Sequence, residues 1–132
     1  MIDKAVAAIR AGRVVVLPTD TVYGLVADAF VVEGRDALYA LKGRDAGQPS
    51  AFVAASLDAL LEYVPELRGP SEAIARALLP GPYTLVLPNP ARRFPWLCGD
   101  NPVALGVRVP ALEDRRATCS NGSAPLSRQA RT

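Results

Sequence analysis

Short apolar runs alternate with amphipathic stretches along the first 110 residues of the chain. Several apolar runs are short enough to predict strands, at residues 13–17, 51–55, 83–87 and 103–109. Other stretches repeat apolar residues at helical spacing and predict helices, at residues 3–11, 33–41, 57–63 and 71–79. Residues 21–29 are mixed in character, and a short helix is one possibility for them. Strands that alternate with helices indicate an α/β domain.

This pattern stops after Pro110. Residues 111–132, ALEDRRATCSNGSAPLSRQART, show almost no apolar periodicity and are rich in Arg, Ser and Ala. Such a composition is typical of loops or disordered segments. We therefore expect a domain body over residues 1–110 and an atypical C-terminal tail over residues 111–132.

Length and composition fit one globular domain. The chain has 132 residues, of which 50% are hydrophobic, enough to fill a core at this size. No apolar run approaches the roughly 18 residues needed to span a bilayer. The first ten residues carry charges and lack the apolar region of a signal peptide. We therefore expect a cytoplasmic protein with no membrane association.

The net charge of +2 comes from the end of the chain. Residues 111–132 contain two acidic residues, Glu113 and Asp114, against the arginines Arg115, Arg116, Arg128 and Arg131. The body is therefore neutral overall, which argues against a general polyanion binder.

The chain has no histidine and two cysteines, Cys98 and Cys119. Without histidine, Ser-His-Asp and Cys-His catalysis are excluded. Two cysteines alone make a poor zinc site, so we expect no protein-held metal. Without an export signal, free thiols are favoured over a disulfide.

Polar side chains follow the first apolar run, in the segment PTDTVYGLVADAF at residues 18–30. The hydroxyls of Thr19, Thr21 and Tyr23 would lie at a strand end, where open α/β sheets bind ligands. They suit a small polar ligand such as an amino acid. The alternative is ordinary turn chemistry, in which Thr and Asp side chains bond to nearby backbone.

Lys42 and Arg44 follow the second predicted helix in a glycine-containing loop. The Arg guanidinium can bind a phosphate through two parallel hydrogen bonds, and the Lys ammonium can bind it as a point charge. The alternative is a favourable interaction of both cations with the helix dipole. Together with the hydroxyls after the first strand, they favour a nucleotide enzyme.

Two further polar residues occupy strand positions. Thr84 begins a predicted strand after Pro80-Gly81-Pro82 and is either the rim of a cleft or part of a connector. Arg108 lies in an apolar strand, so it must find a partner, face a cleft or lie in water on an edge strand. Trp96 and Cys98, in a proline-rich loop, are interpreted as packing anchors.

Taken in order, these segments resemble the YrdC/Sua5 family, the threonylcarbamoyl-AMP synthases. The resemblance covers about residues 3–110 and rests on four motifs: Pro18–Leu25, Lys42 with Arg44, Pro80–Thr84, and Arg108–Pro110. A Ser-x-Asn motif of the family has its nearest match in residues 118–121, where Asn121 fits and Cys119 replaces the serine. Only residues 111–117 separate this match from Arg-Val-Pro. In the family a helix and a strand lie between the two motifs, so the resemblance implies a shortened C-terminus.

The resemblance implies a YrdC-like fold, a twisted mixed β-sheet with surrounding helices and a concave cleft. It also implies a nucleotidyltransferase that makes threonylcarbamoyl-AMP from L-threonine, bicarbonate or CO2 and ATP with Mg²⁺, releasing pyrophosphate, with an activity that the short C-terminus would impair. By resemblance, the site residues are Thr19, Tyr23 and Thr84 for threonine, the catalytic Lys42 and Arg44 for the triphosphate, Cys119 and Asn121 for the nucleotide, and Arg108 in the cleft.

The partners implied by the resemblance are a threonylcarbamoyl transferase complex and, through it, adenosine 37 of tRNA. The main alternative is a non-catalytic YrdC-like module that binds nucleotide or RNA, as tRNA or double-stranded RNA. The short C-terminus and the Arg-rich tail favour this alternative, and the intact Thr19, Lys42 and Arg44 favour the enzyme. A third reading, carbamoyl transfer to another acceptor, would require a further domain.

Overall fold

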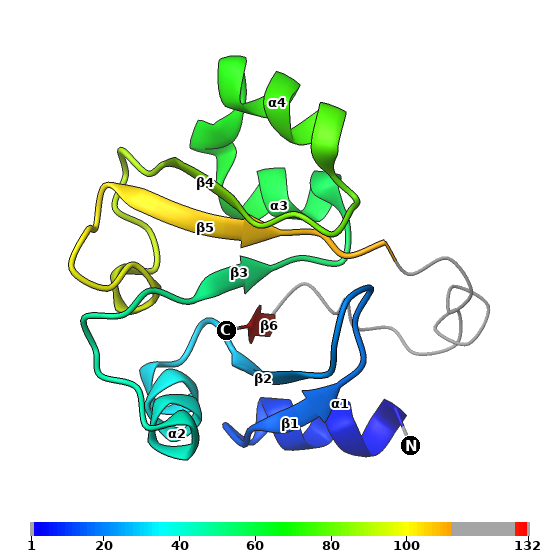
Figure 1. The fold of residues 1–132 in the computed structure, drawn as a ribbon, viewed down its shortest axis with the longest axis vertical. Helices are drawn as coiled ribbons and strands as arrows, with labels where there is room; N and C mark the ends of the chain where they lie inside the picture. The colour runs from blue at the N-terminus through cyan, green and yellow to red at the C-terminus, as the bar shows by residue number, and fades with distance from the viewer. Residues whose placement is uncertain (1, 112–128, 132) are drawn as a thin grey trace.

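Six strands form one mixed sheet in the computed structural model, which describes residues 2–111 and 129–131 (Figure 1). Their order is β1-β2-β6-β3-β5-β4. The bounds are β1 Val15–Leu17, β2 Gly24–Asp28, β3 Ala51–Val53, β4 Leu85–Pro88, β5 Ala104–Arg108 and β6 Gln129–Arg131. β3 and β5 pair in parallel, and the other pairings are antiparallel. The mixed sheet confirms the predicted fold class.

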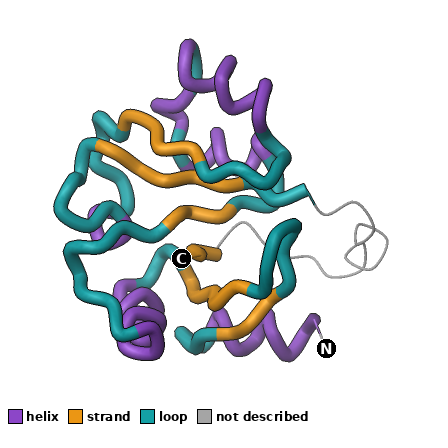
Figure 2. Tube along the Cα trace, viewed as in Figure 1, coloured by secondary structure: helices purple, strands orange, loops and turns teal. Residues whose placement is uncertain are grey.

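Helices flank both halves of the sheet (Figures 1 and 2). α1 (Ile2–Arg10) and α2 (Val32–Lys42) pack beside β1 and β2, and α3 (Leu57–Tyr63) and α4 (Pro70–Leu78) lie beside β4 and β5. Two single turns, η1 (Pro65–Leu67) and η2 (Pro95–Leu97), complete the described elements. No helix among them is long and apolar enough to cross a membrane.

The main hydrophobic core lies under the β3–β5 half of the sheet. Its fully buried side chains come from β3, α3, η1 and β5, and include Phe52, Leu60, Leu61, Leu67, Leu105 and Val107. Burying one such side chain stabilises the fold by about 1.5–3 kcal/mol. A smaller cluster of Ala27, Leu38 and Tyr39 joins β2 to α2.

Local signals fix the start of α3 and the end of α2. The Ser56 hydroxyl accepts a hydrogen bond from Ala59 N at 3.1 Å, which caps α3 at its predicted start. Gly43 has a left-handed φ of 64°, which ends α2 at Lys42. The turn at Gly43 therefore separates Lys42, on the helix, from Arg44, in the following loop.

Two segments differ from the sequence prediction. Within residues 21–29, where the sequence left a short helix as one possibility, Gly24–Asp28 form the strand β2 instead. β2 is a central strand whose consecutive residues are buried, so it lacks the alternating pattern of a half-exposed strand. Within the expected tail, Gln129–Arg131 form β6 between β2 and β3. Residues 112–128 lie outside the described residues.

Candidate functional site

The loop between β1 and β2 is organised by the hydroxyl of Thr19. Thr19 Oγ1 donates a hydrogen bond to the carbonyl of Val22 and accepts one from Thr21 N at 3.4 Å. The turn chemistry considered for this segment is therefore present. The Thr21 hydroxyl also lies 3.4 Å from Thr19 Oγ1, so a ligand that donates to Thr19 would replace one of two long contacts with Thr21.

Arg108 reaches this loop from the end of β5. Its Nη2 lies 2.7 Å from Asp20 Oδ1 and donates to Thr21 Oγ1 at 3.0 Å. Ala111 N donates to the other carboxylate oxygen of Asp20 at 3.1 Å. The side chains of Asp20 and Arg108 are only 8% and 10% exposed. β5 lies between β3 and β4, so Arg108 is a buried, paired arginine and not an edge-strand arginine in water.

Asp20 carries a negative charge in this setting. Burial raises the pKa of Asp20, but the hydrogen bonds from Arg108 and Ala111 N and the charge of Arg108 outweigh it and hold the pKa below its usual value. The two side chains therefore form a neutralised ion pair.

Thr84 and Tyr23 lie near the same end of the sheet. Leu85 pairs with Val107, which places the preceding residue, Thr84, beside the strand end that carries Arg108. Tyr23 belongs to the Thr19 loop, and the residue is 75% exposed. The structure therefore brings Thr19, Thr84 and Arg108 together, and Tyr23 extends into solvent from the same loop.

Arg44 belongs to a second cluster, around Tyr39. Its Nε donates to Gln48 Oε1 at 2.8 Å, and its Nη2 donates to Pro49 O at 3.2 Å. The Arg44 guanidinium also lies 5.7 Å from the centre of the Tyr39 ring. Lys42 lies two positions before Arg44, as the last residue of α2, and is exposed.

The two clusters lie at opposite ends of the parallel strands β3 and β5. Arg108 pairs with Val53 at the end of β3, whereas Arg44 contacts Pro49, before β3 begins. Four strand residues span about 13 Å. In Figure 1 the β1–β2 loop lies at the right-hand end of the strands, and the α2–β3 connection lies at the left-hand end. A ligand that contacts both clusters must be extended.

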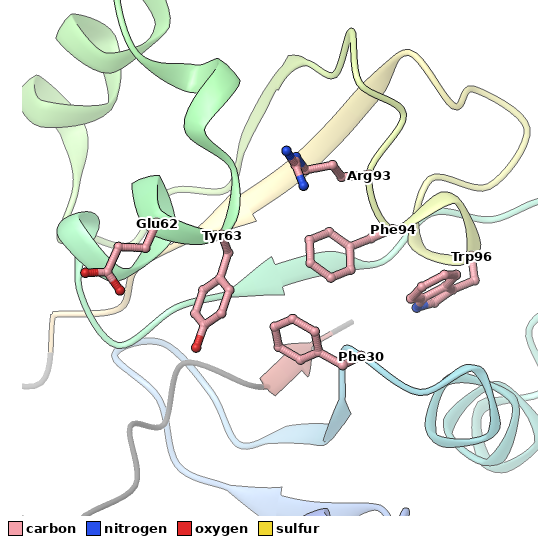
Figure 3. Close-up of a pocket in the computed structure, with 6 residues that line it drawn as sticks. All are labelled: Phe30, Glu62, Tyr63, Arg93, Phe94 and Trp96. Atoms are coloured by element: carbon pink, nitrogen blue, oxygen red, sulfur yellow. The ribbon is translucent and has the colours of Figure 1, made fainter.

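An aromatic pocket, absent from the predicted site, adjoins the second cluster (Figure 3). Its volume is about 430 Å³, and it is lined by Phe30, Glu62, Tyr63, Arg93, Phe94 and Trp96. Ser50 N donates to Leu97 O at 2.8 Å, which ties the η2 wall of the pocket to the start of β3. Its aromatic residues are scattered along the sequence and carry no shared motif, so only the fold shows that they meet.

Trp96 and Cys98 pack as expected from the sequence. The Trp96 indole donates to Ala29 O at 2.9 Å. Cys98 is buried and is a free cysteine. Burial raises the pKa of the Cys98 thiol, which makes it a poor nucleophile at neutral pH.

Cys119 and Asn121, the predicted nucleotide contacts, lie outside the described residues. Their roles remain predictions.

Comparison with known proteins identifies the family. The model of the Sua5/YciO/YrdC family, described as "Telomere recombination", matches residues 7–127. The chain belongs to this family. A cattle protein named threonylcarbamoyl-AMP synthase is 39% identical over 106 residues, and one of the same name from Xanthomonas campestris pv. campestris (strain B100) is 33% identical over 127 residues.

Solved structures of the Sua5/YciO/YrdC family agree with the fold. Sua5 of P. abyssi complexed with L-threonine has a TM-score of 0.78 at 32% identity, and the match covers 99% of this chain and 37% of that one. E. coli YciO has a TM-score of 0.75 at 23% identity, over 99% of this chain and 62% of that one, and supports the fold alone.

The chain spans only part of its relatives. The match covers 80% of this chain but 37% of the cattle protein, and 95% of this chain but 67% of the Xanthomonas protein. The activity of the whole relatives is therefore a proposal for this chain.

Proposed function

We propose that this chain is a cytoplasmic nucleotidyltransferase that forms threonylcarbamoyl-AMP from L-threonine, bicarbonate or CO2, and ATP. Membership of the Sua5/YciO/YrdC family and the names of its relatives support the activity. The proposal rests mainly on the arrangement of two clusters. Hydroxyl groups lie beside Arg108 at one end of β3 and β5, and Arg44 lies at the other end. This layout suits an amino acid at one end and a triphosphate at the other.

Threonine would bind through Thr19, Tyr23 and Thr84. Because the Thr19 hydroxyl already donates to Val22 O, it would accept from a ligand, in place of one of its two long contacts with Thr21. It therefore suits the threonine ammonium group, which donates. The hydroxyls of Tyr23 and Thr84, both exposed, can donate or accept and suit the carboxylate and hydroxyl of the amino acid.

The triphosphate would bind Lys42 and Arg44. A guanidinium has five N–H donors, and Arg44 commits two of its nitrogens to Gln48 and Pro49. These contacts fix the plane of the guanidinium while its remaining N–H groups can reach phosphate oxygens. In this proposal Cys119 and Asn121 add contacts to the nucleotide.

ATP would arrive as its Mg²⁺ complex. Mg²⁺ commonly takes one or two protein carboxylates together with substrate phosphates. Next to the Arg44 cluster, a Cβ added at Gly47 would lie 2.8 Å from Asp100 Oδ2 and 3.1 Å from Asp45 Oδ1. Both carboxylates therefore lie at the same glycine. Asp45 Oδ1 accepts from Gly47 N at 2.9 Å, so the other oxygen of Asp45 and the Asp100 carboxylate would contact the ion. Mg²⁺ would neutralise developing phosphate charge.

The proposed reaction needs positioning more than acid–base chemistry. L-threonine and bicarbonate or CO2 form a carbamate, whose oxygen attacks the α-phosphate of ATP while the bond to the β-phosphate breaks and pyrophosphate leaves. Lys42 and Arg44 would stabilise the negative charge in the transition state. The lack of histidine is compatible with this chemistry. A partner transferase would then move the threonylcarbamoyl group to adenosine 37 of tRNA.

Mass spectrometry of the product tests the activity. The chain would be incubated with Mg²⁺-ATP, L-threonine and carbon-13 bicarbonate. We expect threonylcarbamoyl-AMP that carries one heavy carbon and that is absent when threonine is omitted. AMP without the labelled adduct, or no turnover, would contradict the proposal.

A second candidate is a non-catalytic module that binds RNA. The observation in its favour is the surplus of arginines beyond residue 110, which gives the chain its net charge of +2. RNA binding through phosphates weakens steeply with salt. Binding to tRNA and to double-stranded RNA that falls steeply between low and physiological salt, with no adduct formed, would support this candidate.

A further inference from the structure

One carboxylate, that of Asp20, joins two segments of the chain that are far apart in the sequence. Its Oδ1 pairs with Arg108 at the end of β5, and its Oδ2 accepts from Ala111 N just beyond that strand. Asp20 itself lies in the β1–β2 loop beside Thr19. The loop and the end of β5 are therefore fixed to each other by hydrogen bonds on both oxygens of one side chain.

Stability alone is a weak explanation for this ion pair. Both side chains are about nine-tenths buried, and the desolvation of two charges offsets much of their attraction. Among the described residues, the buried Nε of Arg108 has no hydrogen-bond partner, which adds a further cost. The pair is better explained by the geometry that it fixes.

The fixed geometry includes the hydroxyls proposed to bind threonine. Arg108 donates to Thr21 Oγ1 at 3.0 Å, and Thr21 N donates to Thr19 Oγ1. Thr84 lies beside the strand end that carries Arg108. The ion pair therefore sets the position of Thr19, on one segment, relative to Thr84, on another.

We propose that Asp20 is a positioning residue for the substrate L-threonine. It acts through Arg108 and the Thr19 loop, which it holds in place. This inference rests on the proposed function. Asp20 acts at the threonine end only, because the Arg44 contacts lie before the start of β3, about four strand residues away. Loss of the Asp20 charge will therefore weaken the binding of threonine and leave the binding of ATP unchanged.

The test compares Asp20→Asn with a matched control, Glu66→Gln. Glu66 forms another close Arg–carboxylate pair, with Arg93 at 2.6 Å and 2.8 Å, away from the hydroxyls proposed to bind threonine. We expect Asp20→Asn to raise the Kd and KM for L-threonine about tenfold or more, since small misplacements of binding groups are costly. The KM for ATP should change less than about twofold. Glu66→Gln should alter neither, and Asp20→Glu should restore part of the threonine affinity.

A second variant guards against misfolding. Asp20→Asn leaves Arg108 buried without its counter-charge, so Asp20→Asn with Arg108→Gln removes both charges together. We expect the same selective loss for threonine in this double variant. Folded variants that keep the KM for threonine, or that raise both KM values in parallel, would overturn this inference but would leave the proposed function standing. An unchanged chain that binds no L-threonine would contradict both the inference and the proposed function.

Discussion

The hydroxyl groups of Tyr39 and Ser50 lie 2.6 Å apart and join α2 to the start of β3. The Tyr39 hydroxyl also donates to Gln48 O, in the segment that holds Arg44. Arg35 and Arg44 both lie near the face of the Tyr39 ring, at 5.2 Å and 5.7 Å. A buried tyrosine thus organises the loop that carries the proposed phosphate contact, a role that its place on a helix face did not predict.

Tyr39→Phe tests this role. The substitution leaves Ser50 Oγ and Gln48 O short of a buried partner, so we expect a loss of about 1–3 kcal/mol in the free energy of unfolding. The KM for ATP should rise because the Arg44 loop is less fixed. Urea titration and initial-rate kinetics check both. Tyr83→Phe is the control, because Tyr83 is 50% exposed, and an equal effect of the two changes would contradict the role.

Gly99 holds the loop after η2 against Gly47. Gly99 has a φ of +61°, and a Cβ there would lie 2.4 Å from Gly47 O. Gly12 has a φ of +74° but nothing within 4 Å of its added Cβ. We therefore expect Gly12→Ala to cost about 1–2 kcal/mol for its backbone conformation, and Gly99→Ala to cost distinctly more. Thermal unfolding of both variants measures the difference, and equal losses would argue against the close approach.

Asn89 organises the loop that forms one wall of the aromatic pocket. Its Nδ2 donates to Arg93 O at 2.9 Å and to Pro102 O at 3.2 Å, and its Oδ1 accepts from Arg93 N at 3.0 Å. Asn89→Ala leaves these backbone groups without a hydrogen-bond partner and should lower the free energy of unfolding by about 3 kcal/mol or more. Asn101→Ala, at an exposed position, should stay within about 0.5 kcal/mol. A small effect at Asn89, measured by urea titration, would show that the loop is held otherwise.

Asp20 should make the stability of the fold sensitive to acid. Burial raises the pKa of Asp20, yet hydrogen bonds from Arg108 and Ala111 N keep it below the ordinary value of 3.8. A carboxyl group with a lowered pKa in the folded chain stabilises the fold above its unfolded pKa. That contribution is lost as the pH falls through the folded pKa. The difference in free energy of unfolding between the unchanged chain and Asp20→Asn should therefore be full at about pH 7 and shrink below about pH 4. A difference that stays constant across this range would contradict the ion pair.

Local patterns predicted most of the fold. The helix at residues 57–63 has its predicted bounds because Ser56 caps it and apolar residues recur at helical spacing. β2 was missed because a central strand with four of its five residues buried shows no alternation. β6 was missed because three residues pair with two distant strands, and no local signal marks such pairing.

The site was predicted in parts. The sequence left Arg108 with a partner, a cleft or water on an edge strand as alternatives. Its partner Asp20 lies 88 positions away, and only the fold brings the two together. Thr19, Lys42 and Arg44 were proposed from the sequence because they stand in motifs. The sequence did not show that Arg44 lies at the other end of β3, because the distance between two motifs depends on strand pairing.

Threonine-dependent release of pyrophosphate from ATP, in bicarbonate and Mg²⁺, tests the central claim most directly. The unchanged chain is compared with Lys42→Ala and with Lys4→Ala, an exposed lysine on α1 that serves as the control. We predict release that requires L-threonine, falls about tenfold or more in Lys42→Ala and persists in Lys4→Ala. Release that ignores threonine, or that is equal in all three proteins, would contradict the account.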